Sequence, residues 1–265
     1  MRSRGTVSDA RRAALAALID HAPTFPPASL STPDALAADR RARAGEHAWM
    51  LARLVWPASR LDELEGEDRT LSVLLDAPFG GDMRAEAVET RWEAGLDGLH
   101  GEAYVELPLG DGLEQKIAAL AERGLRAKVR CGGAEVPSAD ALGRFLSACR
   151  AGGVPFKATA GLHHPVCGEY PLTYDDGAPR ARMFGFLNIF VAAAFAQSRA
   201  QERELAEIVD DGEITSFHFG DDELAWRGRT VTVRQIVSAR SSLGLAFGSC
   251  SFQEPVEELR AFGLL

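Results

Sequence analysis

The sequence predicts an α/β fold: a single (β/α)8 barrel of the TIM type with extra helices at its N-terminus. Eight short apolar or alternating runs are separated by stretches of helical periodicity, a pattern typical of strands that pair in parallel. Glycines such as Gly124 and Gly153 stand where helices should end, just before the next strand. The chain has 265 residues, of which 46% are hydrophobic, enough for one large core at the usual size of such a barrel.

The N-terminal part is predicted to form two helices before the strands begin. Residues 8–20 have apolar residues at helical spacing and begin with Ser8 and Asp9, which suit an N-cap. Residues 33–44 look like a second, polar helix. Because Asp20 soon follows the first apolar run, we interpret this segment as a helix and not as a signal peptide.

The strands and helices of the barrel are assigned from the runs that follow. The predicted strands are 49–57, 71–78, 87–92, 103–109, 126–133, 154–161, 214–220 and 245–252, and the clearest helices are 112–124, 138–153 and 184–209. We expect the seven runs from residue 71 onward to be parallel strands of one closed sheet, and residues 1–265 to form one domain. The irregular stretch 161–182 lies where a barrel enzyme places a lid. No G-x-G-x-x-G follows the first strand, which disfavours an open dinucleotide-binding sheet.

Charge and composition restrict the partners of the protein. A formal net charge of -9 disfavours nucleic acid, and no run reaches the roughly 18 apolar residues that a membrane helix needs. The four cysteines lack metal-finger spacing and are too few to staple a chain of this length, so we expect reduced thiols in the cytoplasm. No cofactor is expected. The predicted partner is a small molecule that carries a carboxylate or phosphate, and the sequence is compatible with a homo-oligomer.

Lysine is rare in this chain, and two of its three lysines fall inside predicted strands. Lys128 and Lys157 each stand between small or apolar residues, whereas Lys116 lies on a polar helix. A lysine that is desolvated near another cation has a lowered pKa and becomes a nucleophilic amine. The alternative is that both lysines form structural ion pairs with strand carboxylates such as Glu106.

The run FKATAG resembles the lysine motif K-T/S-S-T-G on strand six of the deoxyribose-phosphate aldolase group of class I aldolases. The resemblance implies a Schiff-base role for Lys157, with Thr159 in the substrate site. Lys128 in RAKVRCGG resembles that family's strand-five lysine, and Glu106 would stand near its strand-three acid. The family also has a strand-seven lysine, but no lysine follows Lys157 here. The segments FPP, PASRLDEL and KATAGLHHP further resemble a group of bacterial proteins, which implies no activity.

The histidines that follow the lysine strand are candidates for proton transfer. His163 and His164 stand at the end of the barrel where enzymes keep their residues, and imidazole titrates near neutral pH. We expect one of them to act and the other to hold the loop, unless both are loop histidines bonded to the backbone. His218 is interpreted as a core histidine. A metal site would be the rival use of the histidines with Glu106 and Cys167, although no local ligand spacing supports it.

Anion binding is predicted at two places. Arg130 is two residues beyond Lys128, so both point to the same side of a regular strand, where Arg130 would hold a carboxylate or phosphate unless it forms a rim salt bridge. Gly248, Ser249 and Ser251 follow the last strand, where barrels often bind phosphate with backbone N–H groups.

The sequence therefore favours an aldolase-like or lyase-like enzyme. Lys157 would be the nucleophile, Lys128 and Glu106 would tune it or relay protons, and His163 would act as acid or base. Two alternatives remain open, a metal-dependent lyase or hydrolase on the same barrel and a barrel without catalysis that serves as a binding subunit. Because barrel enzymes carry their sites at strand ends, we expect Glu106, Arg130, Lys157, His163 and Ser249 to converge on one cavity.

Overall fold

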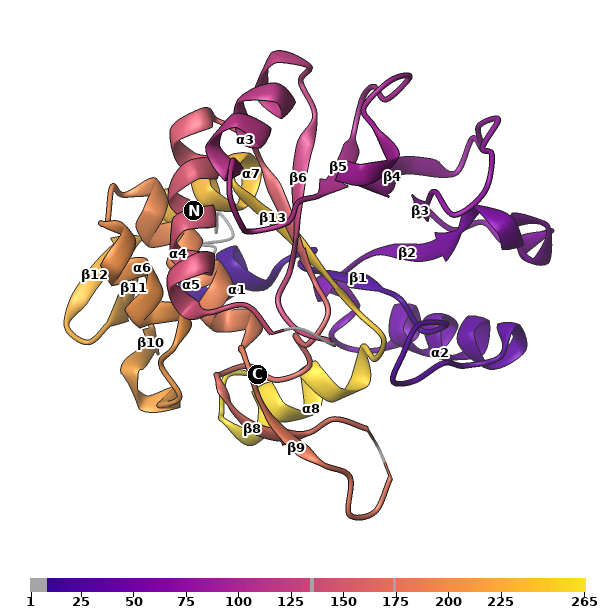
Figure 1. Ribbon diagram of the computed structural model, residues 1–265. Coiled ribbons are helices and arrows are strands. Elements are labelled where there is room, and N and C mark those ends of the chain that lie inside the picture. Colours follow the sequence, from indigo (N-terminus) through magenta and orange to yellow (C-terminus); the bar gives the residue numbers. More distant parts are fainter. Residues whose placement is uncertain (1–8, 134–135, 174) are drawn as a thin grey trace, which may run out of the picture.

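The computed structural model describes residues 9–133, 136–173 and 175–265, so Ser8 lies outside the described residues. Eight parallel strands close into a barrel in the order β1, β2, β3, β4, β5, β6, β7, β13, which confirms the predicted fold class (Figure 1). These strands are β1 (Ile19–His21), β2 (Leu51–Pro57), β3 (Leu71–Leu74), β4 (Ala85–Arg91), β5 (Ala103–Glu106), β6 (Arg126–Arg130), β7 (Phe156–Thr159) and β13 (Gly244–Ser249). Two antiparallel sheets lie outside the barrel, β8 (Gly168–Pro171) with β9 (Arg180–Met183), and β10 (Phe217–Phe219), β11 (Glu223–Trp226) and β12 (Arg229–Thr232).

The helices cover the barrel unevenly. They are α1 (Ala10–Leu15), α2 (Thr32–Ala44), α3 (Leu113–Glu122), α4 (Ala139–Gly152), α5 (Phe186–Gln197), α6 (Glu202–Val209), α7 (Val233–Ser242) and α8 (Gln253–Ala261). Between β2 and β5 the connections contain only loops and the 3-10 turns η2 (Ala58–Leu64) and η3 (Trp92–Ala94); the other such turns are η1 (Ala48–Met50) and η4 (Ile214–Ser216). Figure 1 accordingly shows most helices gathered around β6, β7 and β13, away from the purple strands β2 to β5.

One strand prediction is wrong, and one barrel strand was not predicted. The run 214–220 contains β10, which pairs antiparallel with β11 and not with the barrel. The chain turns back at Gly220, whose backbone N–H donates to the carbonyl oxygen of Glu223 at 2.9 Å. A second turn at Arg227 and Gly228, both with positive φ, then joins β11 to β12. The eighth barrel strand is β1, inside the segment predicted as one helix over 8–20; α1 ends at Leu15, and Ala17 then takes a positive φ of 46°.

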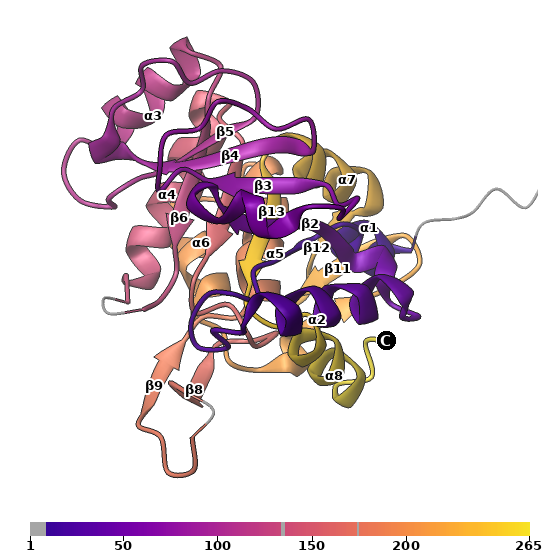
Figure 2. The same ribbon diagram turned by 90° about the vertical axis from the view of Figure 1, so that its right-hand side faces the viewer.

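The predicted long helix 184–209 is also divided in two. The chain leaves the helical path after Gln197, where Arg199 has a φ of 67°, and α6 begins at Glu202. The two halves differ in environment, since α5 is buried almost all round whereas α6 buries one face. The irregular stretch 161–182 contains the β8–β9 hairpin, which projects from one end of the barrel in both ribbon views (Figures 1 and 2).

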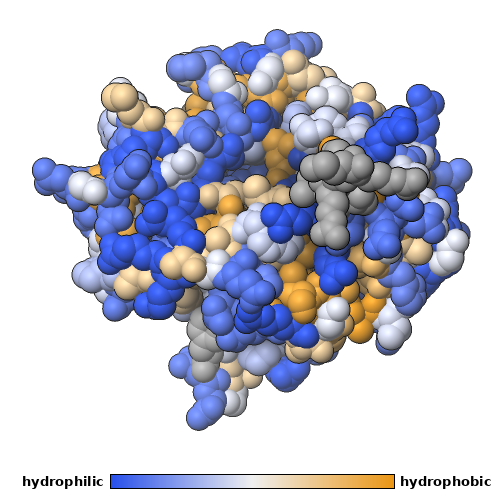
Figure 3. All heavy atoms as spheres, turned by 180° about the vertical axis from the view of Figure 1, so that it is seen from behind, coloured by the Kyte–Doolittle hydropathy of each residue, from blue (hydrophilic) through white to orange (hydrophobic). Residues whose placement is uncertain are grey.

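The apolar core lies between the strands and the helices, outside the barrel itself. Phe247 of β13 stacks on Phe186 of α5, with ring centroids 5.0 Å apart, and Phe156 of β7 stacks on Phe190 of the same helix. Hydrophilic residues dominate the surface seen from behind, with hydrophobic areas exposed among them (Figure 3). All four cysteines are free, as expected, and all four are buried. No helix among the described residues is long and apolar enough to cross a membrane.

Candidate functional site

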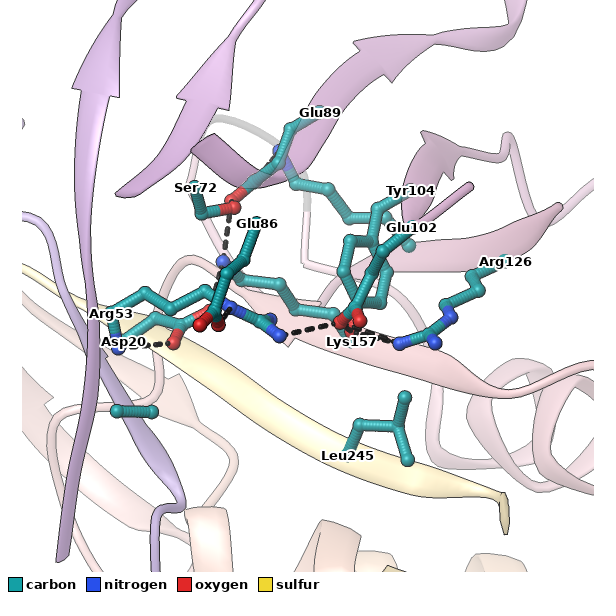
Figure 4. A network of polar contacts seen from close by, with 12 residues as sticks. Asp20, Arg53, Ser72, Glu86, Glu89, Glu102, Tyr104, Arg126, Lys157 and Leu245 are labelled. Atoms are coloured by element: carbon teal, nitrogen blue, oxygen red, sulfur yellow. Dashed lines mark hydrogen bonds and ion pairs between the residues drawn. The ribbon is translucent and has the colours of Figure 1, made fainter. Parts of the chain in front are cut away.

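The interior of the barrel is charged at its centre. Lys157 on β7 is 0% exposed, and its Nζ lies 2.5 Å from Oδ2 of Asp20 on β1 and in contact with Oε1 of Glu89 on β4 (Figure 4). The branched apolar side chains that usually fill such barrels are absent from this position. Three strands that are far apart in the sequence thus contribute one cation and two carboxylates to the same place.

Glu89 connects this centre to the second lysine. Its Oε1 accepts a hydrogen bond of 2.6 Å from Ser72 on β3, and its Oε2 lies 2.9 Å from Nζ of Lys128 on β6. Lys128 also lies 3.3 Å from Glu106, which pairs with Arg130 at 3.1 Å. Cations and anions therefore alternate from Asp20 in the interior to Arg130, whose side chain is 44% exposed at the mouth.

The pKa of Lys157 is raised, so the expectation of a lowered pKa is wrong. Burial alone would lower it, but the negative charges of Asp20 and Glu89 outweigh that effect. In the same way burial would raise the pKa of Glu89, yet Lys157 and Lys128 hold it below its ordinary value. The ion pairs that the sequence suggested with strand carboxylates are present: Lys128 pairs with Glu106, and Lys157 pairs with Asp20 and Glu89.

A second polar layer lies beneath this centre, toward the amino ends of the strands. Glu102 accepts a hydrogen bond of 2.7 Å from Tyr104 and pairs with Arg53 and Arg126 (Figure 4). Burial and the nearby Glu102 raise the pKa of Tyr104 to about 12, so the phenol stays protonated. The Tyr104 ring lies 5.9 Å from the ammonium of Lys157, which adds a cation–π contact to the central cluster.

Small residues line the side of Lys157 that leads toward the mouth. A Cβ atom placed on Gly248 would lie 3.9 Å from Cε of Lys157 and 3.3 Å from Oγ1 of Thr159. Both Gly248 and Thr159 are partly exposed, so they form part of the boundary between the buried lysine and solvent. These two predicted substrate residues therefore do lie next to the predicted nucleophile.

His163 lies at the rim, where it contacts the segment that follows β13. Its Nδ1 is 3.3 Å from Oε2 of Glu254 and 3.8 Å from Sγ of Cys250. Burial would lower its pKa, but Cys250 and Glu254 outweigh that effect and raise the pKa of His163 to about 10. At neutral pH this imidazole is therefore protonated, and both of its ring nitrogens carry hydrogen. Because Cys250 directly follows Ser249, His163 and Ser249 share one end of the barrel, as expected.

His164 belongs to a separate group of contacts. Its Nδ1 lies 2.6 Å from Oε1 of Glu258, and its ring stacks on Tyr170 with centroids 3.5 Å apart. Among the described residues, the group of three or more potential ligands is His164, Glu254 and Glu258, whose ligand atoms all lie within 4.8 Å of one another. The rival metal set predicted from the sequence is not assembled. His218 on β10 is exposed, which also corrects its interpretation as a core histidine.

The two predicted phosphate-binding serines have structural bonds. Oγ of Ser249 donates to the carbonyl oxygen of Ser251 at 2.7 Å, and Oγ of Ser251 accepts from the backbone N–H of Glu254 at the start of α8. An acidic residue thus occupies the first turn of that helix, where a bound anion would lie. The predicted site residues therefore form two sets, an interior lysine network and a rim cluster around the histidines.

Sequence reasoning missed the residues that surround the two lysines inside the barrel. Asp20 was assigned to the first helix, and Glu89 and Ser72 lie in predicted strands without having been singled out. A signal was present for Glu89, since an acidic residue within a predicted strand needs a partner when it is buried. Asp20 gave no comparable signal, because its strand has only three residues.

Comparisons with known proteins assign no family to the chain. No protein-family model, no curated protein and no solved structure matches it. The resemblance of FKATAG to the aldolase motif therefore stays an expectation, and any function has to be argued from the side chains described above.

Proposed function

We propose that the protein is an enzyme of the aldolase or lyase type, which acts on a small anionic carbonyl compound through an imine with Lys157. The observation that carries this proposal is the lysine held between Asp20 and Glu89 at the centre of the barrel. Buried ion pairs are often no more stabilising than apolar side chains of similar volume. Charged groups in such surroundings therefore favour a functional role.

The proton of Lys157 has to leave before the amine can react, and either neighbouring carboxylate can accept it. The free amine then attacks the carbonyl carbon of the substrate and forms a carbinolamine. Return of the proton from the carboxyl group to the carbinolamine hydroxyl expels water and leaves an iminium ion. The positive charge of the iminium then stands between Asp20 and Glu89, where the ammonium stood before.

The iminium withdraws an electron pair from the adjacent carbon–carbon bond. That bond breaks once a base takes the proton of the substrate hydroxyl, so that an aldehyde is released and an enamine remains on Lys157. Glu106 suits this base role because it lies beside Lys128, nearer to the mouth. Protonation of the enamine and addition of water then release the second product. Arg130 is partly exposed beside Glu106 and would bind the anionic group of the substrate.

The proposal predicts that Lys157 forms a reducible imine. The protein is incubated with small aldehydes and ketones that carry a carboxylate or phosphate, reduced with borohydride and mapped by mass spectrometry. We expect a stable adduct on Lys157, with Lys116 as the internal reference for a surface amine, since its Nζ donates to the carbonyl oxygen of Asp111 at an exposed position. Lys157→Arg keeps a cation between the two carboxylates but should abolish the adduct.

Lys128→Arg is the matched control for this experiment, because it changes the other barrel lysine in the same way. The adduct should survive this substitution. An adduct that disappears in Lys128→Arg and persists in Lys157→Arg would move the nucleophile to Lys128. Labelling confined to Lys116 and the N-terminus across the whole panel of compounds would contradict imine chemistry and favour a barrel without catalysis.

A further inference from the structure

We propose that the rim of the barrel binds one divalent transition-metal ion of the zinc class through His164, Glu254 and Glu258. This inference goes beyond the lysine chemistry and does not depend on it. The three ligand atoms lie within 4.8 Å of one another. Ligands of a tetrahedral zinc ion at about 2.1 Å are separated by about 3.4 Å, so shifts on the order of 1 Å bring the set to bonding distance.

The ligand types match the chemistry of such an ion. Imidazole nitrogen and carboxylate oxygen are both ligand types that zinc accepts, and a site with three protein ligands keeps a fourth position open. The side chain of His164 is 9% exposed, whereas those of Glu258 and Glu254 are 30% and 25% exposed. The carboxylate side of the cluster therefore faces solvent, where water or an oxygen of a small ligand can complete the coordination.

The two carboxylates stand four residues apart on α8, so they are neighbours on one face of the helix. Histidine contacts each of them, His164 touching Glu258 and His163 touching Glu254. The cluster thus combines two acidic residues with two imidazoles, which a solvated acidic helix face would not need.

Neighbouring side chains hold the ligands in place. The ring of His164 stacks on Tyr170 at an interplanar angle of 12°, and the Tyr170 hydroxyl donates to the carbonyl oxygen of Val166 at 3.0 Å. His163 lies against both Glu254 and Cys250, so it fixes the carboxylate from the other side. Support of this kind around ligands is what metal sites use to set their orientation.

The proposed ion would join the segments that continue β7 and β13. These two strands are neighbours in the barrel, and they carry Lys157 and Gly248. His164 comes from the loop after β7, whereas Glu254 and Glu258 come from the helix after β13. A metal ion there would stabilise the contact of α8 with the hairpin and would present a binding position for oxygen at the carboxyl end of the barrel.

Zinc binding to the whole chain tests the inference. Protein without an affinity tag is freed of metal with a chelator, dialysed against zinc and analysed for bound metal. We expect saturation at one ion per chain and a rise in melting temperature, because the ion binds the native state. His164→Gln, Glu254→Gln and Glu258→Gln should each weaken binding by about 10-fold or more, with the melting-temperature rise reduced accordingly.

Glu257→Gln is the matched control, since Glu257 is exposed on the same helix and bonds only Gln253 among the contacts described. It should bind zinc like the unaltered chain, and circular dichroism checks that each variant is folded. Cobalt in place of zinc should give visible bands without a thiolate charge-transfer band, because Cys250 is not a ligand in this proposal. Absence of stoichiometric zinc, binding unaffected by the three substitutions, or a thiolate band would overturn it.

Discussion

Glu89 determines the charge balance of the barrel interior, because it is the carboxylate that both buried lysines share. Without it, Lys157 would keep Asp20 and Lys128 would keep Glu106, so two cations would face each other with one partner apiece. Removing one member of a buried ion pair costs more than the pair itself contributes, since the remaining charge stays desolvated. Glu89 is therefore the residue whose loss should be felt most strongly in this network.

We predict that Glu89→Gln lowers the free energy of unfolding by about 3–5 kcal/mol near pH 7. The folded pKa of Glu89 lies below its ordinary value of 4.5. Its contribution to stability is therefore fully present above that value and is lost as the pH falls toward the folded pKa. The difference between the unaltered chain and the variant should shrink between about pH 5 and pH 3, as measured by urea unfolding at each pH.

Glu207→Gln provides the control for this measurement. Glu207 pairs with Arg203 at 3.2 Å on the surface, and both side chains are well exposed. Such a pair contributes about 0–1 kcal/mol, so its loss should have little effect at any of these pH values. A difference for Glu89→Gln that stays constant as the pH falls would contradict the lowered pKa of Glu89.

At the scale of the elements, the spacing of apolar residues predicted most of the barrel strands. It failed for a strand that is very short and for one that pairs with its neighbour in sequence. Seven of the eight predicted runs contain barrel strands, because each has four or more residues between clear breaks. The strand β1 has three residues directly after a helix, which no window of periodicity can separate. β10 resembles a barrel strand in composition, but the chain turns at Gly220 and returns as β11, which pairs with β10 outside the barrel.

The sequence predicted the lysines of the candidate site but not their buried carboxylate partners, for a physical reason. Lysine inside a strand is conspicuous in a chain with three lysines, whereas Asp and Glu make up 38 residues and do not stand out. The partner of Lys157 on β1 is 137 positions away, so only closure of the barrel brings the two together. The direction of the Lys157 pKa followed from those missed carboxylates, and the sequence-based expectation therefore had the wrong sign.

The contact between α4 and α6 predicts that alanine at position 143 destabilises the protein, whereas helix propensity alone would predict stabilisation. Gly143 lies in the middle of α4, and a Cβ atom there would be 2.8 Å from the carbonyl oxygen of Glu202 and 3.0 Å from the backbone nitrogen of Ala206. Replacing glycine by alanine inside a helix normally stabilises it by about 1 kcal/mol. Here the backbone of α6 would have to move, so Gly143→Ala should destabilise the protein by about 1–3 kcal/mol.

Gly110→Ala is the comparison for this substitution, and thermal and urea unfolding measure both. Gly110 is exposed in a loop, has no left-handed φ and has nothing within 4 Å of the added Cβ. That change should be neutral or stabilise by up to about 1 kcal/mol. Equal stabilisation by both substitutions would show that α4 and α6 are not as close as described.

At the scale of the whole molecule, the antiparallel sheet β10–β12 shares its core with the barrel helices. Its buried residues Phe217, Leu224, Trp226 and Val231 belong to the same apolar cluster as α5, and the Trp226 ring packs edge-on against Phe195. The β8–β9 hairpin differs, because half of the residues in its two strands are exposed and only Met183 among them is fully buried. The prediction of a single domain therefore implies that the β10–β12 sheet unfolds together with the barrel, whereas the β8–β9 hairpin opens separately.

Hydrogen exchange measured by mass spectrometry in increasing denaturant tests this prediction without any substitution. Amides of β10–β12 and of barrel strands such as β7 and β13 should converge on one opening free energy, that of global unfolding, because none of these elements can lose its apolar contacts separately. Amides of β8 and β9 should exchange at lower free energy, with little dependence on denaturant, since local opening of an exposed hairpin uncovers little surface. Exchange of β10–β12 well below the barrel strands, with its own denaturant dependence, would divide the chain into two cooperative units and contradict the single domain.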